Sequence, residues 1–267
     1  MKIEKLFSVQ GKVAVVTGGG RGIGKMIASH LVQNGCKVYI ASHPIDEQEN
    51  IDTAKEIGCK AVPADVTNLE SIRRLVKHIS VRETHVDILV NNAGVARSDE
   101  LEYITEETYD LVHGVNQKAI LFMVQQFLPL LEGGASVINL SSVVGSYNTP
   151  ATGAGADYMS AKAGQNRMTA MLAQQLAGRK ITVNGIAPGA TETSMLGQPG
   201  ITYDQNIYIN KINPLKRFVE PQDVGSAVIY LSSKAGSYMT GQILVLDGGV
   251  SQSQTNSDDW VIWEKKT

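Results

Sequence analysis

The stretch VAVVTGGGRGIG, residues 13–24, decides the fold class of this chain. A run of β-branched residues, typical of a buried strand, leads directly into a glycine cluster. IGKMIASHLVQNG follows at residues 23–35, with apolar side chains at helical spacing and a terminal glycine. A strand, a glycine turn and a helix in immediate succession are typical of the first unit of a nucleotide-binding α/β fold.

Short apolar runs and helix-like stretches continue to alternate along the chain, which implies a parallel sheet covered by helices on both faces. No linker rich in Pro, Gly or Ser divides the sequence, so we predict one domain over residues 1–250 and a compositionally different tail at 251–267. A substrate lid is expected over residues 190–215, where apolar residues gather without regular periodicity. Further strands are expected at 37–42, 59–65, 86–94, 135–142, 180–189 and 242–249, and further helices at 45–57, 68–80, 105–131, 156–177 and 221–231.

Composition narrows the class of function. The 267 residues carry a net charge of -2, which argues against a large cationic surface for nucleic acid, and no apolar run is long enough to span a membrane. The first residues lack the apolar core of a secretion signal, and there are only two cysteines, so a reducing, cytoplasmic location is expected. The five histidines show no paired ligand spacing, so no metal site is expected.

The glycine cluster has the pattern G-x-x-x-G-x-G, formed by Gly18, Gly22 and Gly24. Small residues at such a turn allow the backbone to approach a pyrophosphate, while the following helix offers N–H donors and the positive end of its dipole. The strand–turn–helix context therefore favours a nucleotide site over an ordinary glycine turn.

The end of the second strand indicates which nicotinamide cofactor binds. An NAD site usually places an acidic residue there to bind the ribose 2′-hydroxyl. This chain has Ser42 and His43 instead, no acid before Asp46, and Arg21 within the glycine cluster. A carboxylate would repel a 2′-phosphate, whereas Arg21 and Ser42 can bind one, so the sequence favours NADP. The alternative for Arg21 is a solvated loop charge.

Tyr158 and Lys162 stand at i and i+4 in YMSAK, on one face of an expected helix. A nearby ammonium stabilises a phenolate and lowers the pKa of the tyrosine, which makes it usable as a general acid or base. Ser142 ends the fifth strand, where ligands bind in open α/β sheets. Taken singly, these features also fit a chance helical pair and a capping serine.

Together these residues resemble the short-chain dehydrogenase/reductase family, in its branch of about 250 residues built on the doubly wound fold. The similarity is greatest to 3-oxoacyl reductases of the rhamnolipid type and related fungal reductases. It implies a single-domain Rossmann fold with a seven-stranded parallel sheet in the order 3-2-1-4-5-6-7. The resemblance covers residues 8–250 and rests on TGGGRGIG (17–24), Asp65-Val66, NNAG (91–94), Asn116, INLSS (138–142), YMSAK (158–162), Pro188-Gly189, Thr193 and LDGG (246–249).

The family resemblance also implies a role for each matching residue. Tyr158 would donate the proton in reduction, Lys162 would lower its pKa and bind the nicotinamide ribose, and Ser142 would hydrogen-bond the substrate carbonyl. Asn116 would hold a water that relays protons to Lys162, and Thr193 would orient the nicotinamide. Asp65, Val66, Asn92 and Gly94 would border the adenosine half, and further cofactor contacts are expected at Ile23, Ser42, His43, Pro188, Gly189 and Thr191.

The implied activity is hydride transfer between NADPH and the carbonyl carbon of a small or medium, hydrophobic ketone or 3-oxoacyl substrate. Residues 143–157 form a segment slightly longer than the family usually shows, and this segment should border the substrate. A substrate name therefore does not transfer from relatives. An imine reductase, or a non-redox catalyst or sensor on the same scaffold, remains an alternative.

Members of this family usually associate through two long helices, here 105–131 and 156–177. Apolar residues on the second helix would leave an exposed patch in a monomer. A second family interface lies near strand 242–246, so the expected assembly is a homo-tetramer, or a dimer, with Trp260 and Trp263 of the tail packed on a neighbouring subunit. The apolar residues in question are Met168, Met171, Leu172 and Leu176.

Overall fold

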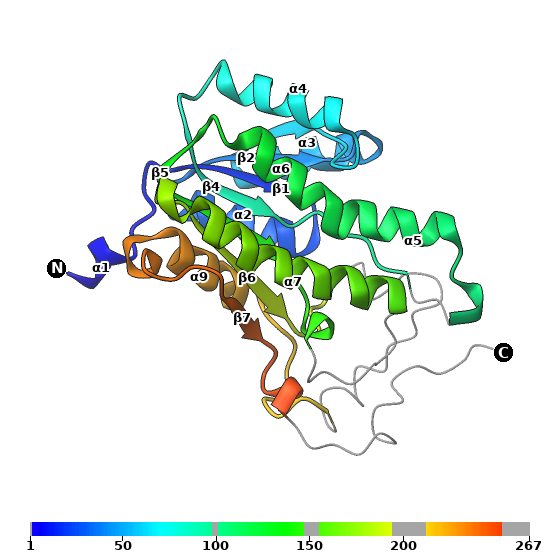
Figure 1. The fold of residues 1–267 in the computed structure, drawn as a ribbon. Helices are drawn as coiled ribbons and strands as arrows, with labels where there is room; N and C mark the ends of the chain where they lie inside the picture. Colours follow the sequence, from blue (N-terminus) through cyan, green and yellow to red (C-terminus); the bar gives the residue numbers. More distant parts are fainter. Residues whose placement is uncertain (1, 98–100, 147–154, 194–211, 253–267) are drawn as a thin grey trace.

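The computed structural model describes residues 2–97, 101–146, 155–193 and 212–252. These residues form a seven-stranded, all-parallel sheet in the order β3-β2-β1-β4-β5-β6-β7, which confirms the predicted fold class (Figure 1). The strands are β1 Val13–Thr17, β2 Lys37–Ser42, β3 Lys60–Pro63, β4 Val86–Asn91, β5 Leu131–Leu140, β6 Thr182–Pro188 and β7 Ile243–Leu246.

Helices cover both faces of this sheet. One face carries α4, α6 and α7, with α5 continuing beyond the sheet edge, and the other carries α2, α3 and α9 (Figure 1). In the described part of the chain no helix is both long enough and apolar enough to cross a membrane. The α-helices are α1 Ile3–Leu6, α2 Gly22–Gln33, α3 Glu47–Ile57, α4 Leu69–Ser80, α5 Glu106–His113, α6 Ala119–Phe127, α7 Ala156–Leu176 and α9 Pro221–Ser232. Short 3₁₀ turns lie at Pro44–Asp46, Leu101–Tyr103, Val143–Gly145, Ala177–Arg179, Lys234–Gly236 and Val250–Gln252.

Strand β1 shows why the sequence forms a two-sided core. All five of its residues are buried. Val13 and Val15 pack in the apolar cluster beneath α4, α6 and α7, while Ala14 and Val16 pack in the cluster beneath α2 and α9. Because successive strand side chains point to opposite faces, a continuous apolar run is what a sheet covered on both sides requires.

The strand order reverses between β1 and β4, which pair with each other at the centre of the sheet. From β1 the chain winds outward through β2 and β3, and it returns to β4 before winding outward again through β5, β6 and β7. Connections on the two sides of such a switch point diverge, which leaves a crevice at the carboxyl ends of the strands. The fold therefore positions a site at the ends of β1 and β4.

The expected single helix over 105–131 is wrong in detail. A π-type turn, Gly114–Lys118, separates α5 from α6. The Asn116 side chain supplies the physical reason: its Nδ2 donates to Val112 O at 2.9 Å, the carbonyl that a regular helix would offer to the Asn116 N–H. A side chain that takes this carbonyl favours a locally wider turn.

The fifth strand also differs from the expectation of 135–142, because β5 begins at Leu131. Leu131 pairs with Val86, and the register then shifts before Ile88 pairs with Ser136. Gly133 and Gly134 lie within this irregular part, and Gly134 has a φ of 100°. A glycine pair predicts a turn, which is why the sequence pattern placed the start of the strand too late.

Two predicted segments fall largely outside the described residues. Of the expected lid at 190–215, the structure describes only residues 190–193 and 212–215. Of the expected tail at 251–267, it describes only Ser251 and Gln252. The two tail tryptophans, Trp260 and Trp263, also lie outside the described part.

Gly225 allows α9 to pack closely on α2. A Cβ at residue 225 would lie 2.3 Å from His30 Cγ, and the His30 ring is held by a 3.0 Å hydrogen bond between its Nδ1 and Met26 O. We expect Gly225→Ala to lower the free energy of unfolding by about 1–3 kcal/mol through overpacking, as measured by chemical denaturation. Gly178→Ala is the matched control, because a Cβ there meets nothing within 4 Å. Equal effects of the two substitutions would contradict this explanation.

Candidate active site

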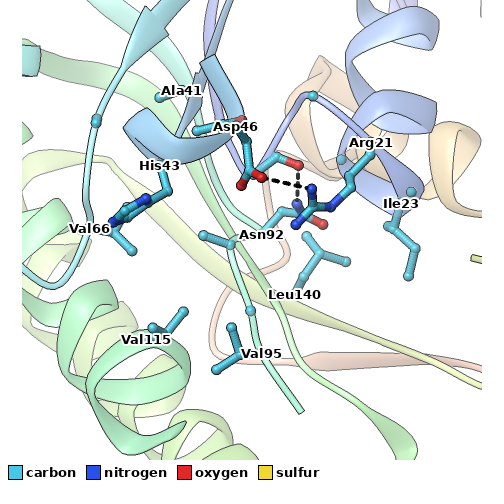
Figure 2. A pocket seen from close by; sticks show the side chains of 18 of the residues that line it. Arg21, Ile23, Ala41, His43, Asp46, Val66, Asn92, Val95, Val115 and Leu140 are labelled. Carbon is cyan, nitrogen blue, oxygen red and sulfur yellow. Dashed lines mark hydrogen bonds and ion pairs between the residues drawn. The ribbon is translucent and has the colours of Figure 1, made fainter. Parts of the chain in front are cut away.

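A pocket of about 410 Å³ opens at the carboxyl ends of the central strands (Figure 2). It extends from the glycine turn and the end of β2, across β4, to the first turns of α7. Most of the predicted cofactor residues contribute to its wall, as do two of the four predicted catalytic residues. The predicted residues that line it are Gly18, Arg21, Gly22, Ile23, Gly24, Ser42, His43, Asp65, Val66, Asn92, Gly94, Tyr158, Lys162 and Thr193.

The glycine turn is packed so closely at Gly18 and Gly24 that no larger residue fits at these two positions. A Cβ on Gly24 would lie 2.1 Å from Gly18 O and 2.5 Å from Asn92 Nδ2. Gly18 and Gly22 have φ values of 62° and 51°, in the left-handed region that favours glycine. Asn92 Nδ2 donates to Thr17 O at 2.8 Å and to Gly18 O at 3.1 Å, which ties the turn to the end of β4. The α2 N-terminus with its free N–H groups therefore faces the pocket, as a pyrophosphate site requires.

Polar side chains surround the part of the pocket at the end of β2. Ser42 Oγ donates to Asn50 Oδ1 at 3.0 Å. Arg21 points across this region and forms ion pairs with Asp46 and Glu49 (Figure 2). Sequence reasoning noted Asp46 only as a distant acid and missed Glu49. Their place at the start of a helix that follows β2 is the signal that could have identified both.

Asp65 and Val66, which follow β3, line the pocket. Asp65 Oδ1 accepts hydrogen bonds from the backbone N–H of Thr67 at 2.9 Å and from its hydroxyl at 2.7 Å. These bonds fix the turn after β3, and Asp65 Oδ2 is left 3.8 Å from His43 Nε2. The Val66 side chain and the His43 ring lie together on one side of the pocket (Figure 2).

Tyr158 lies half-buried in the first turns of α7, and Lys162 is fully buried one turn later. The Lys162 Nζ stands 5.6 Å from the centre of the Tyr158 ring. Burial raises the pKa of Tyr158 to about 12, and hydrogen bonding to Ser142 opposes this rise. Burial also lowers the pKa of Lys162 to about 7.

The pKa of Tyr158 is therefore raised by burial, contrary to the expectation that Lys162 lowers it. Desolvation penalises the phenolate and the ammonium alike, so each group favours its neutral form. A protonated Tyr158 is the form that can donate a proton. Ser142, rather than Ser141, interacts with the Tyr158 side chain, whereas Ser141 donates to Asn166 Oδ1.

Lys162 and Asn116 converge beside Gly94. Lys162 Nζ donates to Leu140 O at 2.7 Å and to Gln165 Oε1 at 3.1 Å. Asn116 Nδ2 donates to Val95 O at 2.7 Å, and among the described residues Asn116 Oδ1 has no hydrogen-bond partner. A Cβ on Gly94 would lie 2.9 Å from Asn116 Oδ1 and 4.0 Å from Lys162 Nζ. Glycine therefore leaves open the small space that these two polar groups share.

Five predicted site residues do not line the pocket wall. Asn116 and Ser142 are adjacent to lining residues through the contacts given above. Pro188 ends β6, Gly189 N donates to Leu246 O at 2.9 Å, and the buried Thr191 donates to Gly189 O at 3.1 Å. The last three residues shape the backbone that leads to Thr193, whose side chain lies beside Gly22.

The wall opposite the polar region is apolar, and sequence reasoning missed it. Val95 follows β4, Leu111 belongs to α5, and Val115 belongs to the wide turn after α5. Leu140, at the end of β5, completes this wall (Figure 2). Only the folded arrangement brings these four residues together, because α5 and the two strands are distant in sequence.

Comparison with known proteins gives one consistent result. A family model described as Enoyl-(Acyl carrier protein) reductase matches residues 18–251. The rhamnolipids biosynthesis 3-oxoacyl-[acyl-carrier-protein] reductase of Pseudomonas aeruginosa is 36% identical over 256 residues, which cover 91% of this chain and 97% of that protein. The hydroxynaphthalene reductase-like protein Arp2 of Metarhizium acridum is 34% identical over 257 residues, which cover 91% and 96%. The resemblance expected from the sequence is confirmed.

A solved structure agrees with these relatives. The Pseudomonas aeruginosa RhlG/NADP active-site complex superposes with a TM-score of 0.83 at 33% sequence identity. The match covers 92% of this chain and 99% of that one.

The buried Lys162 makes stability depend on pH in a definite direction. Its pKa is about 7 in the folded protein and about 10.4 in an unfolded chain. Between these values the unfolded state binds more protons, so the free energy of unfolding contributed by Lys162 rises with pH. We expect wild type to gain stability relative to Lys162→Met as pH increases from 7 to about 10, as measured by denaturant unfolding.

Lys55→Met is the control for this experiment, because the Lys55 side chain is largely exposed at 73%. Its unfolding curve should follow the pH dependence of wild type. If the profiles of wild type and Lys162→Met stay parallel, the pKa of Lys162 is not lowered by burial.

Proposed function

Since the chain belongs to the short-chain dehydrogenase/reductase family, we propose that it catalyses the NADPH-dependent reduction of a ketone or 3-oxoacyl carbonyl. One observation carries the proposal: Tyr158 and Lys162 lie in the same pocket as a glycine turn that leaves no room for a side chain at Gly18 or Gly24. A cofactor seat and a proton donor in one crevice are what a carbonyl reductase needs.

The residues of the pocket fit an NADP molecule. The α2 N-terminus and its glycine turn would hold the pyrophosphate, Asp65 and Val66 would border the adenine, and Arg21 with Ser42 would face the 2′-phosphate. Thr193 and Lys162 would orient the nicotinamide half at the other end of the crevice. When bound, the cofactor supplies or accepts the hydride at the substrate carbon.

The chain's own residues handle the substrate oxygen and its proton. Tyr158, protonated at neutral pH, would donate its hydroxyl proton to the oxygen of the reduced carbonyl. Ser142 would hydrogen-bond the same oxygen and stabilise its developing negative charge. Lys162 and Asn116 would hold a water beside Gly94 and return a proton toward Tyr158.

The apolar wall of the pocket supports a hydrophobic substrate. Val95, Leu111, Val115 and Leu140 line the crevice, and Figure 2 shows Val95 and Val115 on the side away from Arg21. The named relatives are a 3-oxoacyl-[acyl-carrier-protein] reductase and a hydroxynaphthalene reductase-like protein, so the comparisons do not favour an imine reductase or a non-redox sensor.

We expect Tyr158→Phe to lower the turnover number by about 10² to 10⁴, because the positioned acid is lost while the ring keeps its packing. Cofactor affinity should stay within a few-fold of wild type. The measurement follows NADPH absorbance with a panel of a 3-oxoacyl thioester, a simple ketone, an imine and an enoyl thioester.

Tyr230→Phe serves as the control, because Tyr230 lies in α9 and contacts Phe7, away from the pocket. It should retain wild-type turnover. Near-normal carbonyl reduction by Tyr158→Phe would rule out the proposed role of the tyrosine, and turnover of the imine or enoyl compound alone would rule out the proposed substrate class.

The proposed assembly is a homo-tetramer that includes a contact through α6 and α7. Leu172 and Leu176 of α7 are buried against the sheet, but Met171 is 47% exposed and Leu121 of α6 is 41% exposed. Both helices cover the same face of the sheet, so these side chains extend one apolar surface that a second copy could bury.

Light scattering at low micromolar concentration tests this assembly. We expect a particle well above the monomer mass of 28.7 kDa. Leu121→Lys combined with Met171→Lys should reduce the particle mass, because burying two ammonium groups at the contact is unfavourable. A wild-type particle of monomer mass contradicts the proposal.

A cytoplasmic location is also proposed. Cys36 and Cys59 are both free thiols, and burial raises their pKa values to about 12 and about 11. Unpaired, unreactive thiols are typical of proteins in reducing compartments.

A further inference from the structure

The guanidinium of Arg21 is paired with two carboxylates at the pocket. Its Nη1 lies 3.0 Å from Asp46 Oδ1 and 2.8 Å from Glu49 Oε2 (Figure 2). All three residues line the pocket, in the region next to the end of β2. Arg21 is therefore not simply a solvated loop charge, and it is also not an unpaired cation waiting for an anion.

The position of the two acids follows from the local sequence. Asp46 ends the short turn Pro44–Asp46, and Glu49 lies in the first turn of α3. Acidic residues are stable at helix N-termini because the helix dipole favours negative charge there. Both carboxylates therefore occupy positions where the helix dipole favours negative charge independently of Arg21.

The other potential cation in this region also faces a carboxylate, since His43 Nε2 is 3.8 Å from Asp65 Oδ2. An anion entering here meets three carboxylates close to one arginine and one histidine. Like charges at such distances repel, and both carboxylates bind Nη1 of Arg21, so a phosphate must displace them to use that nitrogen and otherwise shares one guanidinium charge with them.

We infer that Asp46 and Glu49 are specificity-determining residues, because they compete with the 2′-phosphate of NADP for Arg21. This inference rests on the cofactor proposed above. A ligand without the 2′-phosphate leaves the Arg21 pairs intact, whereas a ligand with it competes with both carboxylates for the same guanidinium. The two acids therefore make the ratio of NADP affinity to NAD affinity smaller than Arg21 alone would make it.

The competition is expected to be modest, because all three side chains are partly exposed: 54% for Arg21, 30% for Asp46 and 47% for Glu49. Exposed ion pairs are weak, so removing both should tighten binding of a 2′-phosphate by about threefold to tenfold. Affinity for the same nucleotide without that phosphate should not change.

Binding of cofactor fragments to the whole protein tests the inference without any turnover. Isothermal titration calorimetry compares adenosine 2′,5′-bisphosphate with adenosine 5′-monophosphate on wild type and on Asp46→Asn combined with Glu49→Gln. We expect the bisphosphate to bind the double variant about threefold to tenfold more tightly, and the monophosphate to bind both proteins equally. Glu56→Gln is the matched control: Glu56 lies on the same helix but pairs with Lys25, outside the pocket.

The same double substitution in an Arg21→Ala background shows whether the acids act through Arg21. Arg21→Ala should weaken bisphosphate binding by about tenfold, and the gain from the double substitution should then disappear. A gain that persists without Arg21 would show direct repulsion and overturn the inference.

Other results also overturn it. Unchanged bisphosphate binding in the double variant would mean that the acids do not compete with the phosphate, and weaker binding would mean that they hold Arg21 in its binding position. Equal tightening for both nucleotides, or an equal gain in Glu56→Gln, would mean a general charge effect. If wild type prefers the bisphosphate but the double variant does not bind it more tightly, the inference fails and the cofactor proposal stands. If wild type binds neither nucleotide, both the inference and the cofactor proposal are contradicted.

Discussion

The contact between Gly24 and the carbonyl of Gly18 is the constraint on which the rest of the molecule depends. With a Cβ in this position only 2.1 Å from that oxygen, no other residue lets α2 start so close to the end of β1. Asn92 then fixes the turn from the neighbouring strand through Thr17 O and Gly18 O. One amide thus holds together the strand, the helix N-terminus and the β1–β4 switch point where the crevice opens.

A second set of buried polar groups supports the opposite end of the crevice. Asn91 of β4 donates to Asn139 of β5 at 2.9 Å, and Asn139 donates to Thr169 of α7 at the same distance. Thr169 donates to the backbone oxygen of Gln165, whose side chain accepts from Lys162. These bonds span two strands and a helix, and they fix the depth and direction of a lysine that desolvation would otherwise push outward.

The fold and most of the pocket could be predicted because they follow from local pattern. Apolar runs at β spacing, stripes at helical spacing and glycines at fixed offsets depend on near neighbours in sequence. What the sequence did not predict depends on contacts between distant segments. The pairing of Arg21 with Glu49, the apolar wall at Leu111 and Val115, and the raised pKa of Tyr158 all arise only when separate elements come together.

The wide turn at Gly114–Lys118 also adds one residue to a helical turn without interrupting the packing of the helices on either side. Val112 before the turn and Phe127 after it are both buried, and Val115 within the turn packs in the same cluster as Phe127, so the apolar stripe continues on one side of the helix. In a regular helix of about 3.6 residues per turn, the position of each residue in the sequence determines whether its side chain lies on the apolar stripe or on the opposite face. By holding one residue more in a single turn, the helix directs the amide of Asn116 at the neighbouring loop and keeps its packing on both sides. A polar group thus enters the core face of a packed helix without displacing an apolar one.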